Sequence, residues 1–240
     1  MKFKFRNTFL VIFALFLSFN AIAQAKDSLW NVWSDTSQSS KLRKQAIDQL
    51  AWGFMGSDLD SAHALGELLY EYAKGLGDKK WMSKALNAKG ASKYFRANYS
   101  SALQAFQQSL KLQLDIDNKS GIANSYNLIG VIRKEQEEYD DALKYYKQSL
   151  EMYESILDSH GLAKAYNNIG EVYYRLEEYN TALDYHQQCL DYNRKLNNAE
   201  NSASIALANI GRDYLELKEY DKALDALYES LEIRMSIGDE

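Results

Sequence analysis

A pattern that recurs about every forty residues constrains this chain more than any other feature of its sequence. Glycines stand at positions 90, 130, 170 and 211, with separations of 40, 40 and 41 residues. Alanines recur with the same spacing, so the repeated small residues are Gly90, Gly130, Gly170, Gly211, Ala102, Ala142, Ala182 and Ala223. A fixed period of this length is typical of a solenoid, in which similar units stack in series.

Each unit reads as two helices. In residues 122–161 the apolar side chains of Ile122, Tyr126 and Ile129 are spaced three and four residues apart, which places them on one stripe of a helix. A break follows, and a second stripe with the same spacing begins. We expect Asp140 to cap the second helix and Gly161 to end it in a left-handed turn. The unit is therefore a helical hairpin whose apolar face is buried only when neighbours stack on it.

The recurring small residues indicate close contact between helices. Glycine inside a helix costs about 0.5–1 kcal/mol relative to alanine. A residue that brings this cost at the same point of successive units is expected where a neighbouring helix leaves no room for a side chain. The alanines that recur in the second helix of each unit favour the same interpretation.

The order of residue types within a unit is more specific than the period. In residues 121–160 it runs Tyr126, Ile129, Gly130, Tyr139, Ala142, Tyr146, Ser149 and Leu150. This order resembles the tetratricopeptide repeat, over about residues 81–239. The resemblance implies an all-α fold, a right-handed superhelical solenoid of antiparallel helical hairpins. The period of about 40 instead of 34 residues and the absence of proline depart from the family pattern.

Residues 1–23 have the pattern of a secretory signal peptide. Lys2, Lys4 and Arg6 precede a short apolar run, and small residues before Gln24 form a cleavage signal. The run is too short to span a bilayer. We therefore expect a periplasmic or secreted protein, cleaved near Ala23. It would be attached to a membrane only if the signal stays uncleaved or the chain continues past residue 240.

The rest of the chain divides by its repeats. Residues 24–40 are expected to form a linker or an N-terminal cap, and residues 41–79 a degenerate first repeat. The array at 80–240 contains units at about 80–120, 121–160, 161–201 and 202–240. The last unit is uncapped at its C-terminal end, which predicts a fragment of a longer protein, self-association through that end, a partner that covers it, or an apolar edge that is tolerated in water.

Composition excludes several classes of function. The net charge of −5 and pI near 5.4 lack the basic surface of a nucleic-acid-binding protein. Cys189 is the one cysteine, so no internal disulfide can form, and its place in a position shared with Ser149 and Ser230 predicts a buried structural thiol.

The sequence contains no recognisable catalytic set. His63, His160 and His186 show neither HExxH spacing nor a cluster with cysteine, and there is no glycine-rich phosphate loop or GxSxG motif. His186 replaces an aromatic residue at a packing position, and His160 is expected in a turn. The sequence therefore predicts no enzyme activity, no cofactor and no metal site.

Binding is better supported. The resemblance implies that the first helices of successive units line a concave groove for a protein or peptide. The matching side chains are Asn87, Asn124, Asn127, Lys134, Glu135, Lys164, Asn167, Glu171, Tyr174, Arg175 and Arg212. Within this set Asn87, Asn127 and Asn167 recur at intervals of forty, and an amide both donates and accepts hydrogen bonds, so it can pair with a peptide backbone. The alternative is that these amides only join neighbouring helices.

The predicted function is a non-catalytic scaffold of the cell envelope that binds a protein or peptide. Lysines and arginines of the groove could receive a carboxylate, although Glu135 and Glu171 stand among them. The alternative is the N-terminal sensory region of a longer signalling protein, with a membrane span and an output domain beyond residue 240. The output domain would be a histidine kinase, a nucleotide cyclase or a DNA-binding regulator, because similar exported arrays precede such domains.

Overall fold

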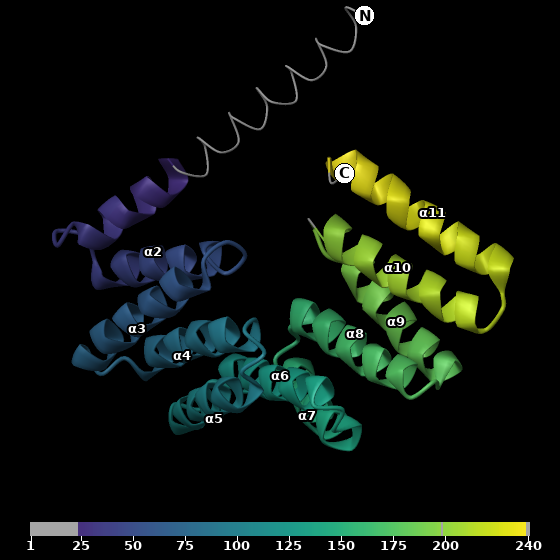
Figure 1. The fold of residues 1–240 in the computed structure, drawn as a ribbon, viewed down its shortest axis with the longest axis horizontal. Coiled ribbons are helices and arrows are strands. Elements are labelled where there is room, and N and C mark those ends of the chain that lie inside the picture. The colour runs from purple at the N-terminus through teal and green to yellow at the C-terminus, as the bar shows by residue number, and fades with distance from the viewer. Residues whose placement is uncertain (1–23, 198, 239–240) are drawn as a thin grey trace, which may run out of the picture. The chain divides into compact units, whose positions relative to one another are not determined.

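The computed structural model describes residues 24–197 and 199–238. Across these ranges the chain forms helices joined by turns and contains no strand, and the predicted signal peptide at residues 1–23 lies outside them. A helical stretch at residues 24–34 comes first. It is followed by α2 (Ser40–Gly53), α3 (Leu59–Gly75), α4 (Lys79–Tyr94), α5 (Tyr99–Asp115), α6 (Lys119–Glu135), α7 (Tyr139–Ser155), α8 (Ser159–Arg175), α9 (Tyr179–Arg194), α10 (Glu200–Glu216) and α11 (Tyr220–Ile237) (Figure 1).

Contacts between residues gather into two compact units, one ending at Ala105 and the other beginning at Phe106, so the division falls within α5. In the second unit α6 pairs with α7, α8 with α9 and α10 with α11, while α7 packs on α8 and α9 on α10 (Figure 1). In the first unit α3 packs against both α2 and α4. The predicted all-α architecture of serial helical hairpins is confirmed.

The repeated glycines lie where two helices of a hairpin approach closely. A Cβ atom on Gly130 would lie 2.7 Å from the ring of Tyr146 on α7, and one on Gly170 would lie 2.6 Å from the imidazole of His186 on α9. Gly211 meets α11 in the same way. These distances are shorter than any ordinary carbon–carbon contact. The side chain of the second helix thus occupies the space that glycine leaves open.

Two sequence predictions about helix ends are wrong. Helix α7 begins at Tyr139, so Asp140 lies inside its first turn instead of capping it. A carboxylate at that place still stabilises the helix through the positive end of its dipole. Gly161 lies in the first turn of α8 and has no left-handed backbone. It is required for space, because a Cβ there would lie 2.1 Å from the ring of Tyr153.

The left-handed positions in the turns are held by other residue types. Glycine usually fills such positions because a Cβ atom makes them unfavourable. Six non-glycine residues, most of them twenty positions apart, have a positive φ: Ala97, Asp117, Glu137, Leu157, Glu177 and Lys218. The regular spacing shows that helices and turns keep a nearly constant length. The one extra residue that makes the last glycine separation 41 instead of 40 falls in the turn between α9 and α10.

The stretch at residues 24–34 covers part of the first hairpin. Trp33 is buried with Ala46, Ile47 and Leu50 of α2, and its ring meets that of Tyr72 edge-on at 5.0 Å. An apolar cluster therefore begins before the first recognisable repeat. None of the described helices has both the length and the apolarity needed to cross a membrane.

Candidate functional site

The predicted binding residues all lie on the first helix of a hairpin. They are Asn87 on α4, Asn124, Asn127, Lys134 and Glu135 on α6, Lys164, Asn167, Glu171, Tyr174 and Arg175 on α8, and Arg212 on α10. In the second unit, hydrogen bonds between side chains join α6 to α8 and α8 to α10. We refer to the first helix of each hairpin as its A helix, and we call the polar surface of the A helices α6, α8 and α10 the A-helix face.

The asparagines of this face connect helices to one another. Asn127 is fully buried, and its Oδ1 accepts a hydrogen bond of 2.7 Å from the Nδ2 of Asn168. Asn167 accepts in the same way from Asn209 on α10, at 2.9 Å. Asn87 in the first unit is also buried. Burial makes Asn127 and Asn87 inaccessible to a ligand, and the hydrogen bonds of Asn127 and Asn167 support the alternative that these two amides join neighbouring helices.

A charged cluster centred on Glu171 occupies the next part of the A-helix face. Its carboxylate accepts hydrogen bonds from Arg175, at 3.1 Å, and from Arg212 of α10. The guanidinium of Arg212 also lies over the ring of Tyr174, 3.9 Å from its centroid. Burial alone would raise the pKa of Glu171, but Arg212, Arg175 and Lys134 together hold it below its ordinary value. Both arginines are therefore engaged by a carboxylate of the protein itself.

Lys134 is engaged as well. Its ammonium lies 3.4 Å from the carboxylate of Glu135. Of the four basic residues that the sequence offered for a carboxylate ligand, Lys164 alone has no ion pair with any residue that the structure describes. The sequence analysis treated these four residues alike. In the structure Lys134, Arg175 and Arg212 form ion pairs, and Lys164 does not.

Lys164 lies at a hollow between α8, α9 and α10. The hollow has a volume of about 310 Å³ and is lined by His160, Ala163, Lys164, Asn167, Cys189, Asn193, Ser202 and Ile205. No carboxylate lines it. Lys164 remains exposed to solvent, yet the protein around it lowers its pKa, because surrounding atoms replace part of the water that would stabilise the ammonium. The hollow offers a cation and amide donors without an internal anion.

Cys189 at the floor of this hollow is not a reactive thiol. It is buried, and its sulfur accepts a hydrogen bond of 3.3 Å from the Nδ2 of Asn193. Burial raises the pKa of the thiol to about 12. A cysteine acts as a nucleophile through its thiolate, so this residue is protonated and inert at neutral pH.

The histidines also take structural places. His186 is fully buried and its Nδ1 lies 2.5 Å from the Oδ2 of Asp213 on α10, which is equally buried. His63 contacts the hydroxyl of Ser92 at 3.1 Å. His160 is exposed in the first turn of α8 and not in a loop. Nowhere in residues 24–197 and 199–238 do three His, Cys, Asp or Glu side chains gather as a metal site would require.

Sequence reasoning missed Asp213, although a signal existed. Two residues after the repeated glycine, α6 has Ile132 and α8 has Val172, both fully buried. Asp213 stands at the same position of α10. A carboxylate in a series of aliphatic residues could have been recognised as a buried partner for His186.

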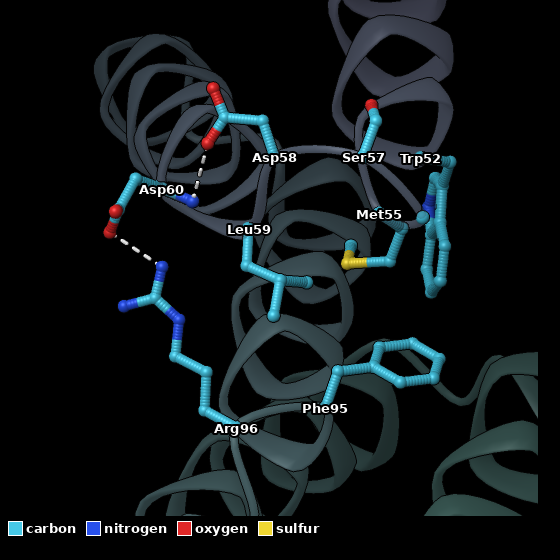
Figure 2. A pocket seen from close by; sticks show the side chains of 9 residues that line it. Trp52, Met55, Ser57, Asp58, Leu59, Asp60, Phe95 and Arg96 are labelled. Carbon is cyan, nitrogen blue, oxygen red and sulfur yellow. Dashed lines mark hydrogen bonds and ion pairs between the residues drawn. The ribbon is translucent and has the colours of Figure 1, made fainter.

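A second, apolar hollow lies in the first unit, where α2 ends. Figure 2 shows Trp52, Met55 and Leu59 on one side and Phe95 below them. Its volume is about 890 Å³, and Trp52 and Phe95 are 44% and 58% exposed. At its rim Arg96 pairs with Asp60 at 2.5 Å (Figure 2). The sequence signal for this hollow was that Phe95 matches charged positions of later repeats, Glu135, Arg175 and Glu216.

Comparisons with known proteins agree on the fold. The family model described as "Tetratricopeptide repeat" matches residues 81–155 and 161–236. No curated protein matched the chain. Similar solved structures include BtubC (BKLC) from P. vanneervenii, with a TM-score of 0.73, 19% identity and 91% of each chain covered. A putative kinesin light chain repeat protein from Podosopora anserina has a TM-score of 0.62, 13% identity and coverage of 82% of this chain and 97% of its own.

A third similar structure is a signal transduction ATPase with a tetratricopeptide repeat sensor from Pyrococcus horikoshii. Its TM-score is 0.62 at 16% identity, over 95% of this chain and 38% of that chain. At these identities the likeness concerns the fold. The described part of the chain thus has the arrangement of helices that the sequence predicted.

Proposed function

The chain belongs to the tetratricopeptide repeat family, and from that premise we propose that it is a non-catalytic scaffold whose A-helix face binds an acidic segment of a protein or peptide. The observation that carries this proposal is the unpaired Lys164 in the hollow between α8, α9 and α10. The other three basic residues predicted to bind, Lys134, Arg175 and Arg212, are paired with carboxylates of the protein itself, so Lys164 is the member of this set that an incoming carboxylate would meet.

The surroundings of Lys164 favour a carboxylate over a neutral ligand. The amides of Asn167 and Asn193 and the hydroxyl of Ser202 line the same hollow. A carboxylate could accept hydrogen bonds from several of them while it neutralises the ammonium, and hydrogen bonds to charged groups are the stronger kind. The lowered pKa of Lys164 supports the same view, because an anion would restore the stabilisation that the ammonium lacks.

The test compares Lys164→Met with a matched control, Lys147→Met. Lys147 is also exposed, but it lies on α7, away from the hollow. The probe is a pool of short peptides rich in Asp and Glu, beside the same pool with Asn and Gln, and the readout is fluorescence anisotropy. We expect parent and Lys147→Met to prefer the acidic pool, and Lys164→Met to lose about tenfold in affinity for it. Equal binding of both pools by the parent would overturn the proposal.

Export from the cytoplasm belongs to the same proposal. It is supported by the basic start, the apolar run and the small residues of positions 1–23. N-terminal sequencing of the protein recovered from an expressing bacterium tests it. A chain that begins at Gln24 outside the cytoplasm is the expected result, and a chain that keeps Met1 inside would contradict it.

The alternative is that the array senses a ligand for an output domain outside these 240 residues. It gains support from the tetratricopeptide repeat sensor of the P. horikoshii protein, which is named as part of a signal transduction ATPase. Reading the gene beyond the codon for Glu240 decides between the two proposals. A continuous frame with a hydrophobic run and a catalytic or DNA-binding domain favours the sensor, and a stop codon favours the scaffold.

A further inference from the structure

The hollow at Lys164 lies where the preceding hairpins are filled by a side chain of the protein itself. Helix α9 follows α7 by 40 residues, so Asn193 stands at the position of Tyr153. Helix α10 follows α8 by 41 residues, so Ser202 stands at the position of Gly161. Each pair lies between the second helix of one hairpin and the first helix of the next. The two interfaces therefore allow one place in the repeat to be compared directly.

Between α7 and α8 this place is occupied by an aromatic ring. Tyr153 is 4% exposed and belongs to an apolar cluster with Ala123. A Cβ atom on Gly161 would overlap its ring, so the glycine makes room for the phenol. Between α5 and α6 the long side chain of Gln113 fills the same place next to Gly121. In both cases a large side chain and a glycine together close the surface.

Between α9 and α10 both members of the pair have changed. Asn193 is shorter than tyrosine or glutamine, and its Nδ2 donates a hydrogen bond of 3.3 Å to the sulfur of Cys189. Ser202 replaces the glycine and is exposed. All three residues line the hollow of about 310 Å³, together with Ala163, which is the counterpart of Ala123. The hollow is thus the space that a large side chain of α9 would occupy.

The size and the lining of this space favour an aromatic ring. An apolar cavity of about 150 Å³ already admits benzene, so a space of about 310 Å³ holds a ring with part of the chain that carries it. Ala163 is buried and Ile205 is 44% exposed, and both offer apolar contacts to the ring. Lys164 lines the same space, and a cation over the face of an aromatic ring is attracted by its charge distribution. An aliphatic side chain would gain the apolar contacts alone.

The charge of the hollow decides what can stand beside the ring. No carboxylate lines it, and Lys164 has no ion pair with any residue that the structure describes. His160 lies one helical turn before Lys164 and also lines the hollow. A segment that inserts a ring can therefore place a carboxylate at the ammonium without repulsion from the protein.

We propose that the hollow receives an aromatic side chain of the bound segment, next to the acidic residue that pairs with Lys164. The ring takes the place that Tyr153 takes in the preceding interface. The ligand is therefore an acidic segment that contains phenylalanine or tyrosine. This inference rests on the proposed function, because it requires that the A-helix face binds an acidic segment. It adds a second requirement, which the charge of Lys164 alone does not impose.

The first test separates the two requirements. Four pools of short peptides combine either Asp and Glu or Asn and Gln with either Phe and Tyr or Leu and Val, and fluorescence anisotropy measures binding. We expect the parent to bind the acidic aromatic pool at least about tenfold more tightly than the acidic aliphatic pool. Equal affinity for the two acidic pools would overturn this inference and leave the proposed function in place. Equal affinity for the acidic aromatic and amide aromatic pools would instead overturn the proposed function itself.

The second test fills the hollow from inside. Asn193→Tyr with Ser202→Gly gives α9–α10 the residues of α7–α8, and we expect this double variant to lose the roughly tenfold preference for rings. Its preference for acidic over amide peptides should remain, because Lys164 is unchanged. The control is Ser202→Gly alone, which leaves the hollow open and should keep the preference for rings. Thermal unfolding reports whether both variants are folded. A folded double variant that prefers rings as strongly as the parent would contradict the assignment.

A photocrosslink on the parent protein locates the ring without any substitution in the chain. The acidic aromatic peptides are made with p-azidophenylalanine in place of Phe and Tyr, irradiated with the protein, and the products are mapped by mass spectrometry. We expect attachment to the residues that line the hollow, such as Asn193 and Ile205. The first unit has its own apolar hollow at Trp52 and Phe95. Attachment there alone would overturn the assignment of the ring to the hollow at Lys164.

Discussion

Two interfaces of the second unit have the same geometry and different chemistry. Between α7 and α8, Tyr146 packs with Val172 inside an apolar cluster. Between α9 and α10, the same two positions hold His186 and Asp213, joined at 2.5 Å with both side chains fully buried. The imidazole Nε2 and the second carboxylate oxygen have no hydrogen-bond partner. The repeat therefore dictates the places of side chains more strictly than their polarity.

The apolar interface between α7 and α8 favours stability, whereas the polar pair between α9 and α10 favours specificity in which side chains face each other. Burial raises the pKa of Asp213, although His186 and Arg212 oppose the shift. A buried pair of ionisable side chains is often no better for stability than well-packed apolar residues, but the loss of one partner leaves the other buried without compensation. The α9–α10 interface is thus expected to be the one where single substitutions have the largest effect.

The largest predicted effect is the loss of one member of this pair. Asp213→Val and His186→Tyr, each alone, are expected to lower the free energy of unfolding by about 3–5 kcal/mol, because the remaining polar group stays buried without its partner. Urea unfolding followed by far-UV circular dichroism measures the loss. A single variant as stable as the parent would show that water or relaxation replaces the missing partner.

The double variant His186→Tyr, Asp213→Val gives α9–α10 the residues of α7–α8. We expect it to match or exceed the parent by about 1–4 kcal/mol. The folded-state pKa of Asp213 lies above the unfolded value near 4. Stability from this carboxyl is therefore fully present below pH 4 or so and is lost as pH rises, which means that the advantage of the double variant should grow with pH.

The next largest loss of stability is expected from substitution of the glycines that face Tyr146 and His186. Gly130→Ala and Gly170→Ala place a methyl group 2.7 Å from the Tyr146 ring and 2.6 Å from the His186 ring. Overpacking of this kind costs about 1–3 kcal/mol. Gly75→Ala, which meets nothing within 4 Å, is the control and is expected to be neutral or slightly stabilising. Thermal unfolding that ranked the three variants equally would contradict the close-approach interpretation.

These contrasts show what the sequence could reveal and what it could not. The hairpins follow from the period, because glycine and alanine recur where helices touch. The packing position of His186 followed from the same period, but its partner Asp213 lies 27 residues later, on the next hairpin. The asparagines were ambiguous because an amide suits a neighbouring helix as well as a ligand. Only the positions of Asn168 and Asn209 decide that Asn127 and Asn167 are engaged.

A smaller effect is expected at Glu171, which stands at the position of Val131 in the preceding hairpin. Glu171→Gln removes a carboxylate that binds Arg175 and Arg212, and is expected to cost about 1–2 kcal/mol at pH 7. The folded-state pKa of Glu171 is below the unfolded value near 4.3. This stability is present above that value and is lost as pH falls, so the parent and the variant should converge in acid.

Unfolding titrations at several pH values test this convergence. Glu177→Gln is the control, since Glu177 is exposed in the turn between α8 and α9. It should unfold like the parent across the range. If Glu171→Gln stayed less stable than the parent by the same amount from pH 7 down to pH 3, the stabilisation by Glu171 would not depend on its ionisation. Glu171 and Val131 of α6 would then differ only in the shape of their side chains.

The smallest effect lies in the turns that connect the hairpins. Leu157, between α7 and α8, is 85% exposed and has a φ of 54°, a conformation that is costly for a residue with a branched side chain and easier for asparagine. Leu157→Asn is expected to raise the free energy of unfolding by about 0.5–1 kcal/mol. The control is Leu176→Asn, in the turn after α8, where φ is −82° and no strain can be relieved.

Because the gain of Leu157→Asn comes from the backbone, it should add in full to the gain of the His186→Tyr, Asp213→Val double variant. A gain that vanished in the combined variant would mean that the turn and the α9–α10 interface are coupled, and that the two interfaces cannot be compared as independent parts of one array.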